Sequence, residues 1–134
     1  MKCVIPAKME YLSELLEFIE NFMLSSTKEL GISEPCYETI NILLEVSDEI
    51  FSNIVNYAGM SIEENVDFNV EFNPDKVVLE FRDKGKKFNP LTQEIPTDIP
   101  RGNGNGLRMI LERTDEQKYV YEDGHNIFTV SKNM

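Results

Sequence analysis

The sequence predicts an α+β fold in which helices lie on one face of a mostly antiparallel sheet. Two stretches, 12–30 and 33–58, repeat apolar residues at the spacing of amphipathic helices. Two others, 65–83 and 118–132, have the strand patterns and turn residues of hairpins. This order of elements places the helices in a layer on the sheet. A chain of 134 residues can build one core, so we expect a single domain spanning residues 1–134.

The N-terminal part provides a strand and two helices. The apolar run 3–7 contains Pro6, which lacks a backbone donor and therefore suits an edge strand. A first helix ends before Gly31, and its apolar stripe consists of Leu12, Leu15, Leu16, Ile19, Phe22 and Met23. A second, largely buried helix starts at 33–35 and ends at Gly59; its stripe consists of Ile40, Leu43, Leu44, Ile50, Phe51, Ile54, Val55 and Ala58.

The middle of the chain predicts a hairpin and a long loop. Strands at 65–73 and 76–83 flank a turn at Pro74 and Asp75. Residues 84–105 follow with lysines, prolines and glycines but no periodicity. A loop of this length in a compact domain is usually functional or disordered.

A short helix and a second hairpin complete the predicted fold. The helix is readable from Leu107 to Thr114, and Asp123 with Gly124 is a good signal for a tight hairpin turn. The single histidine, His125, stands at this turn without an indicated partner, so we interpret it as a turn residue.

Charge and cysteine content limit the classes of function. The formal net charge of -11 disfavours nucleic acid and anionic membranes as partners. The only locally basic stretch is 84–108, which suits a small anionic ligand or is simply a solvated loop. No signal peptide or long apolar run is present, so we expect a cytoplasmic protein with Cys3 and Cys36 reduced and buried.

A row of polar side chains follows one face of the second helix. Glu45, Glu49 and Asn53 are spaced by four residues and therefore stack along the helix. A solvated polar face explains this row for most amphipathic helices. Asn53 and Asn56 are poor residues for a helix interior, however, and a carbonyl ligand to a hard cation is one compensating role.

Two further motifs each permit a structural and a functional interpretation. Asp83 and Gly85 end a strand, either as a plain turn or as an acceptor for an exocyclic amine beside room for a flat ring. The run "RGNGNGL" precedes a helix, either as loop slack or as a phosphate cradle flanked by Arg101 and Arg108. Its spacing matches neither the dinucleotide fingerprint nor the P-loop.

Taken in order, three segments resemble the nucleotide-binding boxes of Bergerat-fold ATPases and kinases. They are "EIFSNIVNYAG" (49–59), "DKGKKFNPL" (83–91) and "GNGNGLRMILERTDEQKYVYEDGHNIFTV" (102–130). The chain is most similar to anti-sigma regulatory factor kinases, which are serine/threonine kinases that control bacterial sigma factors by partner switching. "VIPA", "D-x-G-x-x-F-N-P" and "D-G-x-N" fit that subfamily in particular. The resemblance implies a two-layer α/β sandwich of Bergerat type with a mostly antiparallel, mixed sheet.

The resemblance also implies roles for individual residues around Mg²⁺ and ATP. Glu49 would orient or deprotonate the attacking hydroxyl, Asn53 would hold Mg²⁺, and Asp83 would accept from the adenine amino group. Residues 86–105 would form a mobile lid. The other residues implied in nucleotide binding are Gly85, Arg101, Gly102, Gly104, Gly106 and Leu107.

The implied partners are a sigma factor and an anti-anti-sigma antagonist, with a possible homodimer. Departures from the family pattern are Tyr57, where a histidine is common, and Asn105, where leucine or methionine is common. No "GT" pair supports Asp83 in the last hairpin; Asn126 or Thr129 could substitute. The competing interpretations are a non-catalytic ATP/ADP-binding regulatory module and an interaction domain that binds no nucleotide.

Overall fold

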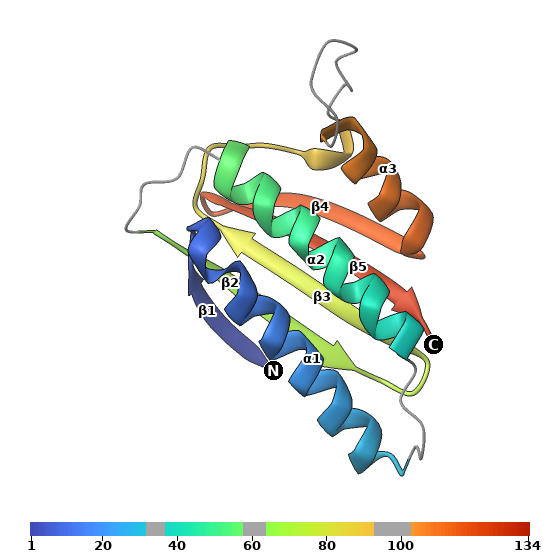
Figure 1. The fold of residues 1–134 in the computed structure, drawn as a ribbon. Helices are drawn as coiled ribbons and strands as arrows, with labels where there is room; N and C mark the ends of the chain where they lie inside the picture. Colours follow the sequence, from blue (N-terminus) through green and yellow to red (C-terminus); the bar gives the residue numbers. More distant parts are fainter. Residues whose placement is uncertain (32–36, 58–63, 93–102) are drawn as a thin grey trace.

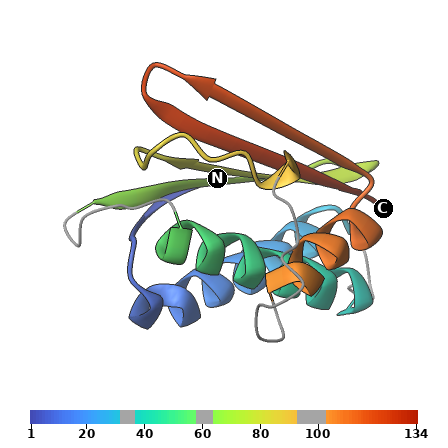
Figure 2. The same cartoon turned by 90° about the horizontal axis from the view of Figure 1, so that it is seen from above.

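The computed structural model describes residues 1–31, 37–57, 64–92 and 103–134. It consists of two layers, with helices on one face of a five-stranded sheet, which confirms the predicted α+β class (Figures 1 and 2). The elements in chain order are β1 (Lys2–Pro6), a short 3-10 helix (Met9–Tyr11), α1 (Leu12–Glu29), α2 (Tyr37–Tyr57), β2 (Asn65–Phe72), β3 (Lys76–Asp83), a second 3-10 helix (Pro90–Thr92), α3 (Asn103–Arg113), β4 (Glu116–Glu122) and β5 (His125–Asn133).

The strand order is β1-β2-β3-β5-β4, so β1 lies at an edge, as predicted from Pro6. All four pairings between the described strands are antiparallel, rather than mixed. The last strand in the sequence, β5, therefore lies between β3 and β4. This crossing brings the end of β3 beside the start of β5, where Asp83 pairs with Asn126.

The core lies between the helices and the inner face of the sheet. Along β3, Val77, Leu79 and Phe81 point inward and are fully buried, as expected from the alternation of a half-buried strand. The Phe68 and Phe81 rings pack with centroids 4.9 Å apart. Asp83 takes the next inward position of β3 and is buried as well. The strand therefore carries a carboxyl group to the end of an otherwise apolar face.

Two turns, one between β4 and β5 and one after α1, lie where the sequence predicts that these elements end. Asp123 and Gly124 both have positive φ, 52° and 76°, which matches the type I′ turn expected between β4 and β5. Gly31 has a φ of 74° and follows α1, as glycine does after many helices. His125 lies directly after the hairpin turn, and its Nδ1 is 2.9 Å from the Asp123 carbonyl oxygen.

The start of α3 differs from the prediction. The helix begins at Asn103, four residues before the expected start at Leu107, so Gly104 and Gly106 lie inside it. Glycine is a weak helix former, which is why the glycine run was placed in the preceding loop. Packing overrides this propensity, because Gly106 is buried and Ile110 of α3 is part of the core.

Three smaller expectations complete the comparison. Cys3 is half-buried rather than buried, and partial burial raises the pKa of its thiol. Cys36, the predicted helix start at 33–35 and Gly59 lie outside the described residues. Within the described ranges, no helix has both the length and the apolar content needed to span a bilayer.

Candidate functional site

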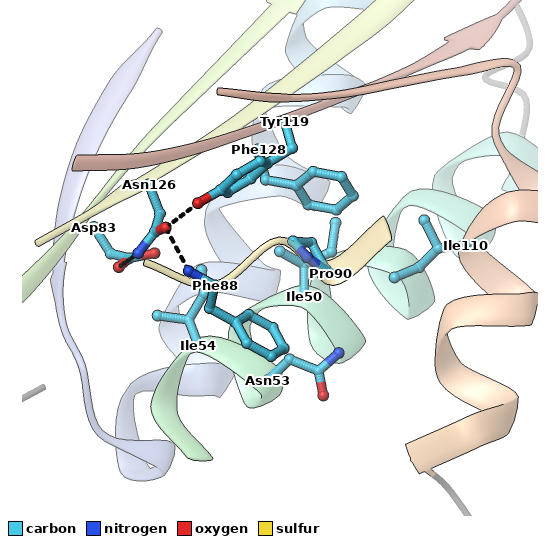
Figure 3. A pocket seen from close by; sticks show the side chains of 10 residues that line it. All are labelled: Ile50, Asn53, Ile54, Asp83, Phe88, Pro90, Ile110, Tyr119, Asn126 and Phe128. Atoms are coloured by element: carbon cyan, nitrogen blue, oxygen red, sulfur yellow. Dashed lines mark hydrogen bonds between the residues drawn. The ribbon is translucent and has the colours of Figure 1, made fainter. Parts of the chain in front are cut away.

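A small cavity lies between α2, the end of β3 and the β4–β5 hairpin (Figure 3). It has a volume of about 30 Å³. Its walls are mostly apolar, and its polar groups come from the ends of different elements. The lining residues are Ile50, Asn53, Ile54, Asp83, Phe88, Pro90, Ile110, Tyr119, Asn126 and Phe128.

Asp83 places a buried carboxylate in this cavity. The residue is only 4% exposed, and its Oδ1 accepts hydrogen bonds from the Gly85 N–H at 2.9 Å and from Asn126 Nδ2 at 3.0 Å. Burial raises the pKa of Asp83, and these two hydrogen bonds act in the opposite direction. Both of these bonds, which join described residues, end on Oδ1 rather than Oδ2.

Asn126 connects Asp83 to the segment that follows β3. Besides its bond to Asp83, its Nδ2 donates to the carbonyl oxygens of Lys86 at 2.9 Å and Gly85 at 3.3 Å. Its Oδ1 accepts from the Phe88 N–H at 3.0 Å and from the Tyr119 hydroxyl. Figure 3 shows Asp83, Phe88 and Tyr119 arranged around this one amide.

Of the two residues that could support Asp83, the structure selects Asn126. Asn126 and Phe128 point to the helix side of β5, whereas Thr129 belongs to the alternate set on the open face. Alternation within a strand could have excluded Thr129 from the sequence alone. The bonds of Asn126 to the 85–88 segment and to Tyr119 had no comparable sequence signal.

Phe88 and Pro90 occupy the space beside these polar groups. The Phe88 ring stacks on Tyr57 at the end of α2, with centroids 6.3 Å apart and planes 20° apart. In Figure 3 the ring lies beside Ile54 and Asn53. The cavity is small because these side chains fill most of it.

On α2, Glu49 and Asn53 lie one turn apart and both are half-buried. Burial is the largest cause that raises the pKa of Glu49; the nearby Asp48 carboxylate also raises it, and a hydrogen bond with Asn53 lowers it. Glu45 does not join Glu49 and Asn53, because its carboxylate forms an exposed ion pair with Arg113 of α3. The predicted row thus divides into a site-facing pair and a surface residue.

Gly106 is the point of closest approach between α3 and Glu49. A β-carbon built on Gly106 would overlap the Glu49 carboxyl group, so only glycine allows this contact. Of the other predicted residues, Gly85 is buried beside Asp83, Gly104 lies in the first turn of α3, and Leu107 is half-buried on α3.

Part of the predicted site lies outside the described ranges. Arg101 and Gly102 lie outside the described residues, as do residues 93–102 of the expected 86–105 lid. Residues 103–105, at the end of the expected lid, belong to α3. The structure brings Asn53 and Asp83 to one cavity, and it brings Glu49 to Gly106.

We expect Asp83→Asn to change how stability depends on pH. Burial raises the folded-state pKa of Asp83 above its ordinary value of 3.8, so the folded protein holds this proton more tightly than the unfolded chain. The ionised group therefore lowers stability progressively as pH rises above 3.8. The variant should gain free energy of unfolding relative to the parent as pH rises from 3.8 through the raised folded-state pKa. Urea titrations at several pH values measure this difference.

Asp67→Asn is the control for the change in net charge, because it removes the same charge from an exposed position of β2. A constant difference between Asp83→Asn and the parent over this pH range would contradict the assigned effect of burial.

Gly106→Ala tests the contact between α3 and Glu49. Alanine is favoured over glycine within a helix by about 1 kcal/mol, but its methyl group must here displace the Glu49 side chain. We expect the stabilisation to be smaller in the parent than in a Glu49→Ala background, where the overlap is absent. Free energies of unfolding of the four proteins give the coupling. Equal effects in the two backgrounds would exclude the contact.

The family comparison agrees with this geometry. Residues 5–132 match the model of the family described as histidine kinase-like ATPase domain. A search of curated proteins gave no match. Because the family match extends over nearly the whole chain, this protein belongs to the histidine kinase-like ATPase domain family.

Proposed function

We propose that this protein is an ATP-dependent serine/threonine kinase that acts as an anti-sigma regulatory factor. The observation that carries the proposal is that Asp83, from the end of β3, and Asn53, from α2, line one cavity. Family membership supports ATP as the ligand. The kinase activity and the partner switching rest on the resemblance of the three sequence motifs to anti-sigma regulatory factor kinases.

The Asp83 end of the cavity would recognise the base. Its Oδ2, which takes neither of the bonds to Gly85 and Asn126, would accept a hydrogen bond, so it suits the exocyclic amine of adenine and disfavours a carbonyl oxygen at the same place. Gly85 is buried directly beside it and leaves space for a flat ring. The apolar side chains of Ile50, Ile54 and Phe128 provide the walls that such a ring requires.

The cavity must enlarge before a base can enter. About 30 Å³ holds one or two water molecules, whereas ligand pockets usually measure about 300 to 1,000 Å³. Phe88 and Pro90 belong to the segment after β3 and fill much of the space. Their displacement is therefore the expected first structural change on binding.

The Asn53 end would face the phosphates and Mg²⁺. Among the described residues no group of three histidine, cysteine or acidic side chains could hold a metal. Magnesium needs no such group, because it usually retains water and binds one or two protein oxygens together with phosphate. The Asn53 amide nitrogen can donate to Glu49, which leaves the Asn53 carbonyl oxygen for the metal.

Glu49 would position or deprotonate the hydroxyl that receives the phosphoryl group. Mg-ATP would supply the transferable group, and the transfer depends mainly on positioning and charge neutralisation. Burial raises the pKa of Glu49, which makes its carboxylate a better proton acceptor than an exposed one. We place Gly104, Gly106 and Leu107 in the phosphate region because they belong to the first turns of α3. Arg101 and Gly102 complete that proposal.

The proposed partners are a sigma factor, which the protein would sequester, and an antagonist that carries the acceptor serine or threonine. We propose a homodimer on the same resemblance, and a cytoplasmic location as expected from the sequence. The net charge of -11 favours protein partners over nucleic acid.

A second candidate is a non-catalytic module whose affinity for a partner depends on ATP or ADP. The nearly filled cavity favours this second candidate. A nucleotide that enters the cavity would displace Phe88 and move the segment after β3, which is a conformational change rather than a chemical step. Both candidates require nucleotide binding, and they differ only in phosphoryl transfer.

We expect calorimetry to show Mg-dependent binding of ATP in preference to GTP. Asn53→Ala should remove the dependence on Mg²⁺, because the proposed metal ligand is lost. Asn56→Ala is the matched control, since Asn56 is exposed on the same helix. Unchanged Mg-ATP affinity in Asn53→Ala would refute the metal assignment, and no binding by the parent at millimolar nucleotide would refute the proposed function.

Glu49→Gln should retain ATP binding but slow turnover by roughly 10² to 10⁴-fold, the usual effect of losing a general base. Formation of ADP from Mg-ATP, with and without a candidate phosphoacceptor, measures the rate. Glu45→Gln makes the same change one helical turn earlier, in a residue that pairs with Arg113 at the surface, and should turn over at the parent rate. Equal rates for Glu49→Gln and the parent would favour the non-catalytic module.

A further inference from the structure

The segment that follows β3 is attached to both layers of the fold. On the sheet side, the Asn126 amide accepts from the Phe88 N–H at 3.0 Å and donates to the Lys86 carbonyl oxygen at 2.9 Å. On the helix side, the Phe88 ring stacks on Tyr57, the last residue of α2. Residues 85–90, which we call the closing segment, therefore link the sheet to α2 at the cavity.

The contact between Phe88 and Tyr57 has the geometry of a favourable aromatic pair. The ring centroids are 6.3 Å apart and the planes 20° apart, which lies within the range of offset stacking. In Figure 3 the Phe88 ring lies beside Ile54 and Asn53, on the α2 side of the cavity. Tyr57 is also a position at which the sequence departs from the pattern of the anti-sigma kinases. The aromatic contact is therefore a feature of this chain rather than one that the resemblance implies.

The closing segment leaves the cavity only if its backbone moves. Phe88 alone could withdraw its ring by a change of rotamer, but Pro90 also lines the cavity. The proline ring closes on its own backbone nitrogen and fixes φ, so no rotamer carries it away. A backbone movement that withdraws Pro90 also pulls on Phe88, two residues earlier, and breaks its N–H bond to Asn126 together with the stack on Tyr57. Opening of the site is therefore measurable at the Phe88 amide.

The closing segment and a bound base exclude each other. The cavity that remains beside the segment measures about 30 Å³, which is far too small for a base. The apparent affinity for a ligand that needs the open state falls in proportion to the open fraction. Each contact that only the closed state makes lowers this fraction, and one aromatic pair lowers it by about two- to tenfold.

We propose that Tyr57 is a positioning residue that holds the closing segment in the empty site and thereby lowers the affinity for nucleotide. Tyr57 acts through Phe88. This inference deepens the proposed function and rests on it for the identity of the ligand. An aromatic wall that stays beside a bound base would have the opposite effect, because its loss would weaken binding. The sign of the change in affinity therefore separates the two roles.

The first measurement follows hydrogen exchange of the Phe88 amide by NMR, in the full chain without nucleotide. Tyr57→Ala should speed this exchange by about two- to tenfold, because the segment opens more often. Tyr57→Phe retains the ring and should match the parent. The amides of Leu79 and Val130, which are buried in the middle of the sheet, report any change in global unfolding.

The second measurement is the affinity for Mg-ATP by calorimetry. Tyr57→Ala should bind more tightly than the parent, by the same factor that the Phe88 amide shows. Tyr57→Phe should bind as the parent does. Asn56→Ala removes the exposed neighbour of Tyr57 on the same helix, and it should match the parent in both measurements.

Each outcome supports or overturns the inference. Unchanged or weaker binding by folded Tyr57→Ala overturns it and leaves the proposed function intact, and parent-like exchange at Phe88 overturns it as well. If Tyr57→Ala fails to fold, Tyr57→Leu keeps apolar bulk without an aromatic ring, and the same two measurements decide. If no variant binds nucleotide, the proposed function is wrong. Exchange at Phe88 then decides alone whether Tyr57 holds the segment closed.

Discussion

The hydrogen bond between Asp83 and Asn126 joins the two strands on which the site depends. Burying a carboxylate is costly unless its oxygens are satisfied, and here one amide nitrogen and one backbone N–H share that task. The bond forms because Asp83 and Asn126 are paired residues of the β3–β5 ladder and point to the same face. A one-residue change of register would turn one of them to the open face and leave the other unpaired. Strand register and the polar end of the cavity are therefore specified by the same residues.

The helix layer contributes the other half of the site through a close approach. Gly106 lets α3 contact Glu49, and Asn53 lies one turn further along α2 at the cavity. Groups from α2 and groups from the sheet thus face each other across a space that the protein's own side chains fill. A ligand binds in this space only if its contacts are more favourable in free energy than the contacts of Phe88 and Pro90 that it replaces.

Periodicity predicted the strands and the two long helices well, because apolar alternation and helical stripes record which face is buried. Periodicity did not predict the start of α3, because glycine-rich residues have a low intrinsic helix propensity. The close packing of Gly106 against Glu49 determines that start instead. Asp83 and Asn53 were predicted as site residues from motif context; both line one cavity, and their roles stay predictions. The role of Asn126 was left open beside Thr129. Its bonds to the 85–88 segment depend on a strand crossing between β3 and β4 that local sequence does not encode.

The position of β5 has a consequence for synthesis. During translation β3 emerges well before β5, so one side of its backbone has no partner until residues 125–133 have left the ribosome. Until then the nascent chain holds an open strand edge, which is the kind of surface that chaperones bind and that aggregates use. The sheet is completed only when β5, which lies between β3 and β4, arrives last. A ribosome-bound chain stalled before β5 therefore leaves the buried Asp83 without its Asn126 partner, however complete its helices are.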